Sequence, residues 1–180
     1  MAVRWGVIGA GGIADRRTIP EGLVPSDRCE LVAVMDVDEW RARTVADKYG
    51  VPVWTTQIDD VLSRPDVEAV YIATPVYLHK DQVIAAAWAG KHVLVEKPMA
   101  MTLTDGEEML SVCSAQGVKF AAGYMMRFHA HHQRLRQMID EGVLGQVVFG
   151  RAQLTCWYPE IPGAWRQDPA LGGGGAFMDM

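Results

Sequence analysis

Cysteine is scarce in this sequence. Three cysteines occur among 180 residues, at Cys29, Cys113 and Cys156, and they lie far apart. None has a second cysteine at CxxC spacing, so the sequence argues against a zinc site and against a dithiol redox centre. We expect reduced thiols that are either buried or spare.

Clustered positive charge and long apolar runs are also missing. The chain carries 17 Lys and Arg against 22 Asp and Glu, a formal net charge of −5, and its densest basic spot is the pair Arg16 and Arg17. Nucleic-acid binding requires clustered cations that displace counterions, so we expect no nucleic-acid partner. No apolar run approaches the roughly 20 residues that span a bilayer, and the segment after Met1 enters a strand pattern without the features of a signal peptide. We therefore expect a cytoplasmic protein with no membrane partner.

The composition is that of a folded globular protein, with 49% of the residues hydrophobic and 22% charged. A chain of this length buries about 70% of the surface of its unfolded state, so it needs no disulfide or metal to fold. At roughly 150 residues per domain, the length predicts one domain and a remainder.

Short apolar runs alternate with helical patterns through the first two thirds of the chain. Several runs are apolar almost throughout, as in strands that are covered on both faces. The helical patterns have start and stop signals: Asp38 is an N-cap for a helix that stops at Gly50, and Thr104 and Glu107 have capping-box spacing in another. This alternation predicts right-handed βαβ units, and therefore an α/β fold with a doubly wound parallel sheet of the Rossmann type. The expected strands are 4–8, 30–36, 52–55, 69–74, 92–95 and 118–123, and the expected helices are 38–49, 78–89 and 103–116.

The pattern changes after Gly123. It predicts a polar helix over 129–141, a long strand over 146–157, and then a loop rich in Pro, Trp and Gly. We therefore divide the chain into a Rossmann domain, 1–123, and the beginning of an α+β domain, 124–180. A lone strand and helix cannot close a core, so we expect a fragment or a chain whose second domain is unusually short.

The strongest local motif is the glycine-rich run 9–14, a GxGxxA directly after the first expected strand. Gly9 permits the tight turn, Gly11 lets the backbone approach a pyrophosphate, and Ala14 allows close packing of helix on strand. The N-terminus of the following helix offers N–H groups and a positive dipole end to phosphates. The motif predicts dinucleotide binding by Gly9, Gly11, Gly12, Ile13 and Ala14.

An acidic residue ends the second expected strand. Asp36 follows the glycine turn by about 20 residues, the spacing at which a carboxylate accepts hydrogen bonds from the hydroxyls of an adenosine ribose. A carboxylate would repel a 2′-phosphate, which favours NAD over NADP. Arg41 leaves NADP open, because a nearby arginine can accommodate that phosphate. A structural glycine turn beside a surface aspartate is the alternative interpretation.

The run Glu96-Lys97-Pro98 follows the fifth expected strand. Open α/β sheets bind ligands at the carboxyl ends of their strands, which is where Lys97 would lie. Its ammonium group could bind a substrate hydroxyl, stabilise alkoxide character and favour hydride departure. By composition alone, a solvated lysine beside a glutamate would be the simpler interpretation.

Taken together, these motifs resemble the Gfo/Idh/MocA family of nicotinamide-dependent oxidoreductases. The resemblance extends over essentially the whole chain, with the motifs in the family's order. Besides the glycine turn, the acid and the lysine triplet, it rests on Ala73-Thr74-Pro75 with His79 following, on Ala89-Gly90-Lys91-His92-Val93, and on Gly172-Gly173-Gly174 leading to Asp179.

The resemblance implies roles for residues of the first domain. Thr74 and Pro75 would line the dinucleotide cleft, and His79 would lie near the phosphate and nicotinamide side of the cofactor. Glu96 would contact the nicotinamide half, and Lys97 would be the catalytic lysine that touches the reacting hydroxyl. Relatives also suggest a cis peptide bond at Lys97–Pro98, and the sequence leaves cis and trans open.

The resemblance also implies roles for residues after Gly123. Arg127 would stand at the domain junction, and Trp165 and Arg166 match a loop that approaches cofactor or substrate in relatives. Asp179 matches an acid that helps orient the reacting hydroxyl and precedes a catalytic histidine, which would fall beyond Met180. The implied substrate-binding residues are Lys97, Arg127, Trp165, Arg166 and Asp179, and Lys97 and Asp179 are the implied catalytic pair.

Three histidines close in sequence raise the question of a metal site. His131 and His132 are adjacent, so they project in different directions from a helix, and with His129 they do not predict a metal centre. We therefore expect no bound metal.

The implied function is an NAD-dependent dehydrogenase that moves a hydride between the nicotinamide and a secondary hydroxyl or ketone of a sugar, inositol or related polyol. Relatives form dimers through the second domain, so a homo-oligomer is expected if that domain is complete. A polypeptide that ends at Met180 should bind cofactor with little or no turnover. The alternative is a catalytically silent NAD(P)-binding module that senses or regulates, because doubly wound folds host both roles. Hydrolytic, dehydrative or transferase chemistry with a tightly held cofactor is a third interpretation.

Overall fold

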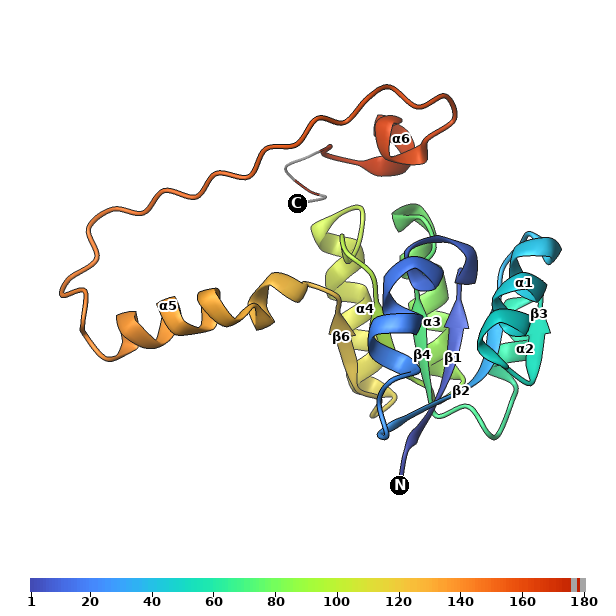
Figure 1. Cartoon of the computed structure of the whole chain (residues 1–180). Coiled ribbons are helices and arrows are strands. Elements are labelled where there is room, and N and C mark those ends of the chain that lie inside the picture. The colour runs from blue at the N-terminus through green and yellow to red at the C-terminus, as the bar shows by residue number, and fades with distance from the viewer. Residues whose placement is uncertain (176–177, 179–180) are drawn as a thin grey trace.

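A six-stranded parallel sheet forms the centre of the computed structural model, which describes residues 1–175 and 178 (Figure 1). The strands lie in the order β3-β2-β1-β4-β5-β6, and each pairs in parallel with its neighbour. This order, reversing direction between β1 and β4, is that of the dinucleotide-binding doubly wound fold, so the predicted fold class is confirmed. The strands are β1 (Val3–Ile8), β2 (Cys29–Met35), β3 (Val53–Thr55), β4 (Ala69–Ile72), β5 (His92–Val95) and β6 (Phe120–Ala122).

Helices cover both faces of the sheet, and the sheet separates two hydrophobic cores, one on each face. Neighbouring residues of a strand point to opposite faces, so Val7 packs with η1 and α1, whereas Ile8 packs with α2, α3 and α4. Both side chains have no exposed surface, which explains why the central strands are apolar along their length. The helical elements are η1 (Ala10–Leu23), α1 (Glu39–Tyr49), α2 (Ile58–Leu62), η2 (Val76–Leu78), α3 (His79–Trp88) and α4 (Leu103–Ala115).

The caps of α1 agree with the sequence, and the N-cap of α4 does not. The Asp38 carboxylate accepts the N–H of Arg41 at 3.2 Å, and Gly50 ends α1 in the left-handed region at φ 66°. In α4 the N-cap is Thr102, whose Oγ1 accepts the N–H of Asp105 at 3.1 Å. The predicted capping box at Thr104 and Glu107 is therefore wrong. Thr104 already lies inside the first turn, where its own backbone is helical and its side chain cannot close the helix end.

The part of the chain after β6 departs further from expectation. The predicted helix over 129–141 is confirmed as α5 (Ala130–Asp140), preceded by the short helix η3 (Met125–Phe128). The predicted strand over 146–157 is wrong: these residues have no strand structure and run as an extended arch from α5 towards α6 (Figure 1). A strand requires a partner for its N–H and C=O groups, and local sequence pattern does not supply one. Val148, Phe149 and Trp157 are each at least 80% exposed.

Two short helices close the described part of the chain. They are η4 (Trp165–Gln167) and α6 (Pro169–Gly172), which pack on each other, and α6 also lies beside η2. This segment therefore lies near the carboxyl ends of the strands (Figure 1). Among the described residues, no helix combines the length and the apolarity that crossing a membrane requires.

Candidate functional site

The candidate residues of the first domain gather at the carboxyl ends of five strands of the sheet. Gly9 follows β1, Asp36 follows β2, Glu96 follows β5 and Gly123 follows β6, while Thr74 lies two residues beyond the end of β4. The strand order reverses between β1 and β4, and the helices that follow these two strands, η1 and α3, pack on opposite faces of the sheet. Ligands of open α/β folds bind in the crevice outside such a point.

The glycine turn is fixed against the loop after β4. Gly9 has φ 86°, and a Cβ at this position would lie 2.9 Å from the backbone of Ala73 and Thr74. Its N–H donates to the carbonyl oxygen of Met35 at 2.8 Å. Any side chain at Gly9 would be strained and would push the two loops apart, so the backbone can approach a ligand closely only with glycine here.

Asp36 is held against the glycine turn. The residue is 8% exposed, and its carboxylate accepts two backbone N–H groups, from Gly11 at 2.8 Å and from Asp38 at 3.1 Å. An ionised carboxylate has about four acceptor sites, so acceptor capacity remains for ligand hydroxyls.

Arg41 lies over the same turn. A Cβ on Gly11 would be 2.6 Å from Cδ of Arg41, so the glycine is what allows the arginine stem to pass. The guanidinium Nε lies 3.4 Å from a carboxylate oxygen of Asp38. The structure therefore places the Asp36 carboxylate and the Arg41 side chain on either side of Gly11, beside the first turn of η1.

His79 is buried rather than displayed. The ring is 1% exposed, and its nitrogens lie 3.0 Å from the carbonyl oxygen of Pro98 and 2.9 Å from that of Thr74. Burial lowers the pKa of His79, and the carbonyl contacts oppose that effect without outweighing it. Each ring nitrogen faces a carbonyl oxygen of the protein, so neither is available to a ligand in this conformation. The structure therefore does not support the direct contact between His79 and the cofactor that was expected. The ring joins the loops that follow β4 and β5.

Glu96 and Lys97 belong to a hydrogen-bonded group that sequence reasoning did not find in full. Tyr71 Oη donates to Glu96 Oε1 at 2.5 Å, and the N–H of Lys97 donates to Glu96 Oε2 at 3.0 Å. Thr18 Oγ1 in turn donates to Tyr71 Oη at 2.9 Å. The peptide bond between Lys97 and Pro98, which the sequence had left open, is cis. The one available signal for Tyr71 was a hydroxyl-bearing residue in an otherwise apolar strand.

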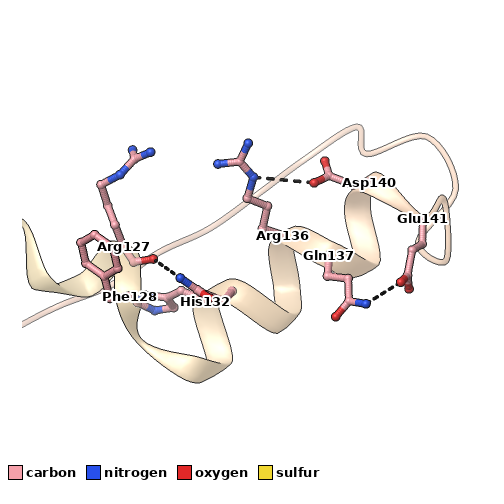
Figure 2. A pocket seen from close by; sticks show the side chains of 8 residues that line it. Arg127, Phe128, His132, Arg136, Gln137, Asp140 and Glu141 are labelled. Carbon is pink, nitrogen blue, oxygen red and sulfur yellow. Dashed lines mark hydrogen bonds and ion pairs between the residues drawn. The ribbon is translucent and has the colours of Figure 1, made fainter.

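The predicted substrate residues after Gly123 are spread over two places. Arg127 lies in a groove of about 760 Å³ between η3 and α5, where Figure 2 shows its guanidinium on the same side as that of Arg136. Trp165 is half-buried in η4, with the guanidinium of Arg166 stacked 4.1 Å from its ring. Asp179 lies outside the described residues.

Comparison with protein families gives two matches, one for each part of the chain. Residues 3–124 match the model of the oxidoreductase family with an NAD-binding Rossmann fold, known as GFO/IDH/MocA. Residues 132–180 match the C-terminal domain of the same family.

Individual relatives and solved structures agree. The chain is 36% identical over 177 residues to 1,5-anhydro-D-fructose reductase of Ensifer adhaerens, which covers 98% of this chain and 53% of the reductase. It is 37% identical over 145 residues to 2,7-anhydro-N-acetylneuraminate hydratase of Mediterraneibacter gnavus, covering 80% of this chain and 38% of the hydratase. A 3-ketoreductase of Actinomadura kijaniata, solved with NADP and TDP-benzene, superposes with a TM-score of 0.84 at 30% identity, over 100% of this chain and 54% of the ketoreductase. The chain thus spans about half the length of the ketoreductase and the reductase, and less of the hydratase.

Proposed function

Because the chain belongs to the GFO/IDH/MocA family of oxidoreductases, we propose that it carries the nucleotide-binding part of an NAD(P)-dependent dehydrogenase or reductase. Its reaction would be hydride transfer between the nicotinamide and a secondary hydroxyl or ketone of a sugar, inositol or related polyol. The relative named for reduction of 1,5-anhydro-D-fructose supports this class of substrate, and the 3-ketoreductase supports the class of reaction.

The observation that carries the proposal is the position of Lys97. It directly follows Glu96 at the carboxyl end of β5, and β5 pairs with β4, so it would lie beside the crevice that the glycine turn after β1 begins. A cation at this place can meet a substrate that lies against the nicotinamide end of a dinucleotide bound along the turn.

The residues of the turn fit a dinucleotide. The glycine at position 9 has no room for a Cβ, and the Asp36 carboxylate, which accepts the N–H of Gly11, has acceptor capacity left for ribose hydroxyls. A pyrophosphate would lie against the first turns of η1. When bound, the nicotinamide would accept or supply the hydride. Lys97 would donate a hydrogen bond to the reacting oxygen and stabilise its negative character as the hydride leaves. Besides the turn residues, the proposed cofactor contacts are Arg41, Thr74, Pro75 and Glu96, and the proposed substrate contacts are Arg127, Trp165, Arg166 and Asp179.

Several further assignments stay predictions, the first and third from the sequence pattern and the second and fourth from the family resemblance. They are the domain division at residue 123, the catalytic role of Asp179, a cytoplasmic location, and assembly into a homo-oligomer through a complete second domain. Arg41 keeps NADP within the proposal, in line with the NADP bound to the ketoreductase.

The test uses the complete product of the gene that encodes this chain, with NAD or NADP and a panel of sugars, inositols and their keto forms. We expect reduction or oxidation of the nicotinamide with at least one of these compounds, and a loss of about 10²–10⁴-fold in Lys97→Met, the range typical of a lost acid–base group. Lys119→Met is the matched control, because Lys119 is exposed and precedes β6 at the opposite edge of the sheet. Tight cofactor binding without turnover on the whole panel would favour the silent sensing module.

A second candidate function has one observation in its favour. The relative from Mediterraneibacter gnavus is named for a hydration and not for a net oxidation. On the same scaffold, a nicotinamide that is reduced and reoxidised within one turnover would permit such a reaction. Cofactor that stays bound through desalting, with substrate converted and no net change in the nicotinamide, would identify this candidate.

A further inference from the structure

Tyr71 is a buried polar side chain at the centre of the sheet. It lies in β4, with Val7 of β1 and Leu94 of β5 as its register partners, and its ring packs in the apolar core beneath η1 and α1. The side chain is 1% exposed. A tyrosine hydroxyl at such depth must find hydrogen-bond partners, because water is out of reach.

The partners that the hydroxyl finds belong to two other elements. It accepts a hydrogen bond from Thr18 of η1 and donates one to Glu96, the first residue after β5. Burial and the neighbouring Glu96 carboxylate raise the pKa of Tyr71, so the hydroxyl stays protonated and remains a donor at neutral pH. It therefore connects the helix that follows the glycine turn with the segment that carries the proposed catalytic lysine.

Glu96 passes this connection on to Lys97. One carboxylate oxygen accepts the Tyr71 hydroxyl, and the other accepts the N–H of Lys97. With both oxygens engaged by the protein, the carboxylate has one preferred position, and the backbone of Lys97 is fixed with it.

We propose that Tyr71 is a positioning residue for the reaction: its hydroxyl fixes the Glu96 carboxylate, and through that carboxylate it fixes the start of the Lys97 segment. The inference rests on the proposed function for its catalytic consequence. The fixing of the segment itself does not depend on any activity.

The variant that tests it is Tyr71→Phe, which removes the hydroxyl and keeps the ring. Tyr49→Phe is the matched control, because the Tyr49 hydroxyl also reaches η1, where it donates to Asp15 at 2.9 Å, but has no contact with Glu96. Tyr71→Phe loses the contact with Thr18 of η1 and Tyr49→Phe loses the contacts with Asp15 of η1, so only an effect confined to Tyr71→Phe reports on Glu96. Should Tyr71→Phe fail to fold, Thr18→Val is the second variant, because it removes the hydrogen bond that the Tyr71 hydroxyl accepts and leaves the Tyr71–Glu96 bond in place.

The first readout is amide hydrogen exchange of the peptide that spans 96–101. We expect faster exchange there in Tyr71→Phe than in Tyr49→Phe, measured in the complete gene product without substrate. Equal exchange in the two variants would overturn the proposal.

The second readout is steady-state hydride transfer. We expect kcat to fall by about tenfold to a hundredfold in Tyr71→Phe, as for a displaced catalytic group, while the affinity for ADP-ribose stays unchanged because the adenosine end of the site is untouched. In the Glu96→Gln background the same substitution should have little further effect on kcat, since residues that act through one another are not additive. Additive losses, or an equal loss in Tyr49→Phe, would overturn the catalytic part. A wild-type protein that transfers no hydride would instead refute the proposed function, and hydrogen exchange would still decide whether Tyr71 fixes the segment.

Discussion

At the residue scale, the chemistry of the site depends on side chains whose partners are far away in sequence. Asp36 was predictable as an acid at the end of a strand, and its contact with Gly11 follows from the adjacency of β1 and β2. The Tyr71–Glu96 contact joins a residue of β4 to the first residue after β5, 25 positions away, and no local sequence pattern predicts it. Local motifs therefore identified the chemical groups, whereas the hydrogen bonds that orient them required the fold.

Cofactor choice is a prediction at this scale. We expect Asp36→Ala to weaken NAD binding about tenfold to a hundredfold, the equivalent of about 1.5–3 kcal/mol for a hydrogen bond to a charged group. NADP binding should fall less, because the lost carboxylate also removes a repulsion of the 2′-phosphate. Titration calorimetry with both nucleotides measures the difference.

Two further variants control for structural damage at this position. Asp36→Asn keeps the side-chain size and an acceptor for one of the backbone N–H groups of Gly11 and Asp38. Arg41→Ala should show the opposite preference and weaken NADP more than NAD. Equal losses of both nucleotides in Asp36→Ala would remove the argument for NAD.

At the scale of elements, the sequence predicted which helices and strands exist better than where they begin. Most predicted strands extend one or two residues beyond the residues that form the observed strand. Helix α4 begins at the predicted residue, but its N-cap is a different residue from the predicted one. Hydrophobic period reports the buried face of an element, and that signal accumulates over many residues. A cap depends on the dihedral angles of one residue, and Thr102 and Thr104 differ too little in their sequence surroundings for a choice between them.

The N-cap of α4 therefore supplies a direct test. Thr102→Ala should lower the free energy of unfolding by about 1 kcal/mol, because the N–H of Asp105 loses its acceptor. Thr104→Ala is the matched control, since Thr104 is exposed inside the first turn and should change stability much less. Denaturant titration of the two variants gives the comparison, and a larger loss in Thr104→Ala would contradict the assigned cap.

At the scale of the whole molecule, the chain consists of a well-packed part and an exposed part. The sheet and its helices share a continuous core on each face, and the alternation of strand and helix in the sequence predicted this well-packed part. The segment after β6 was less predictable, because whether 146–157 forms a strand depends on pairing partners that lie elsewhere. In α5 no residue is buried, so this helix has little packing energy in common with the sheet.

This division predicts how cofactor stabilises the molecule. NAD at a hundred times its Kd should stabilise the domain that binds it by about 2.7 kcal/mol, which corresponds to a rise in Tm of about 5–10 °C for a protein of this size. The added protection from hydrogen exchange should appear in β1, β2, η1 and the loops after β4 and β5, where the proposed contacts lie. Exchange in α5 should stay as it is, because α5 shares no buried contact through which the stabilisation could reach it.

Hydrogen exchange with and without NAD measures both parts, and Asp36→Ala at the same nucleotide concentration is the control. Protection that rises equally in α5 would show that the exposed half folds together with the nucleotide domain, and an unchanged Tm at saturating NAD and NADP would refute dinucleotide binding itself.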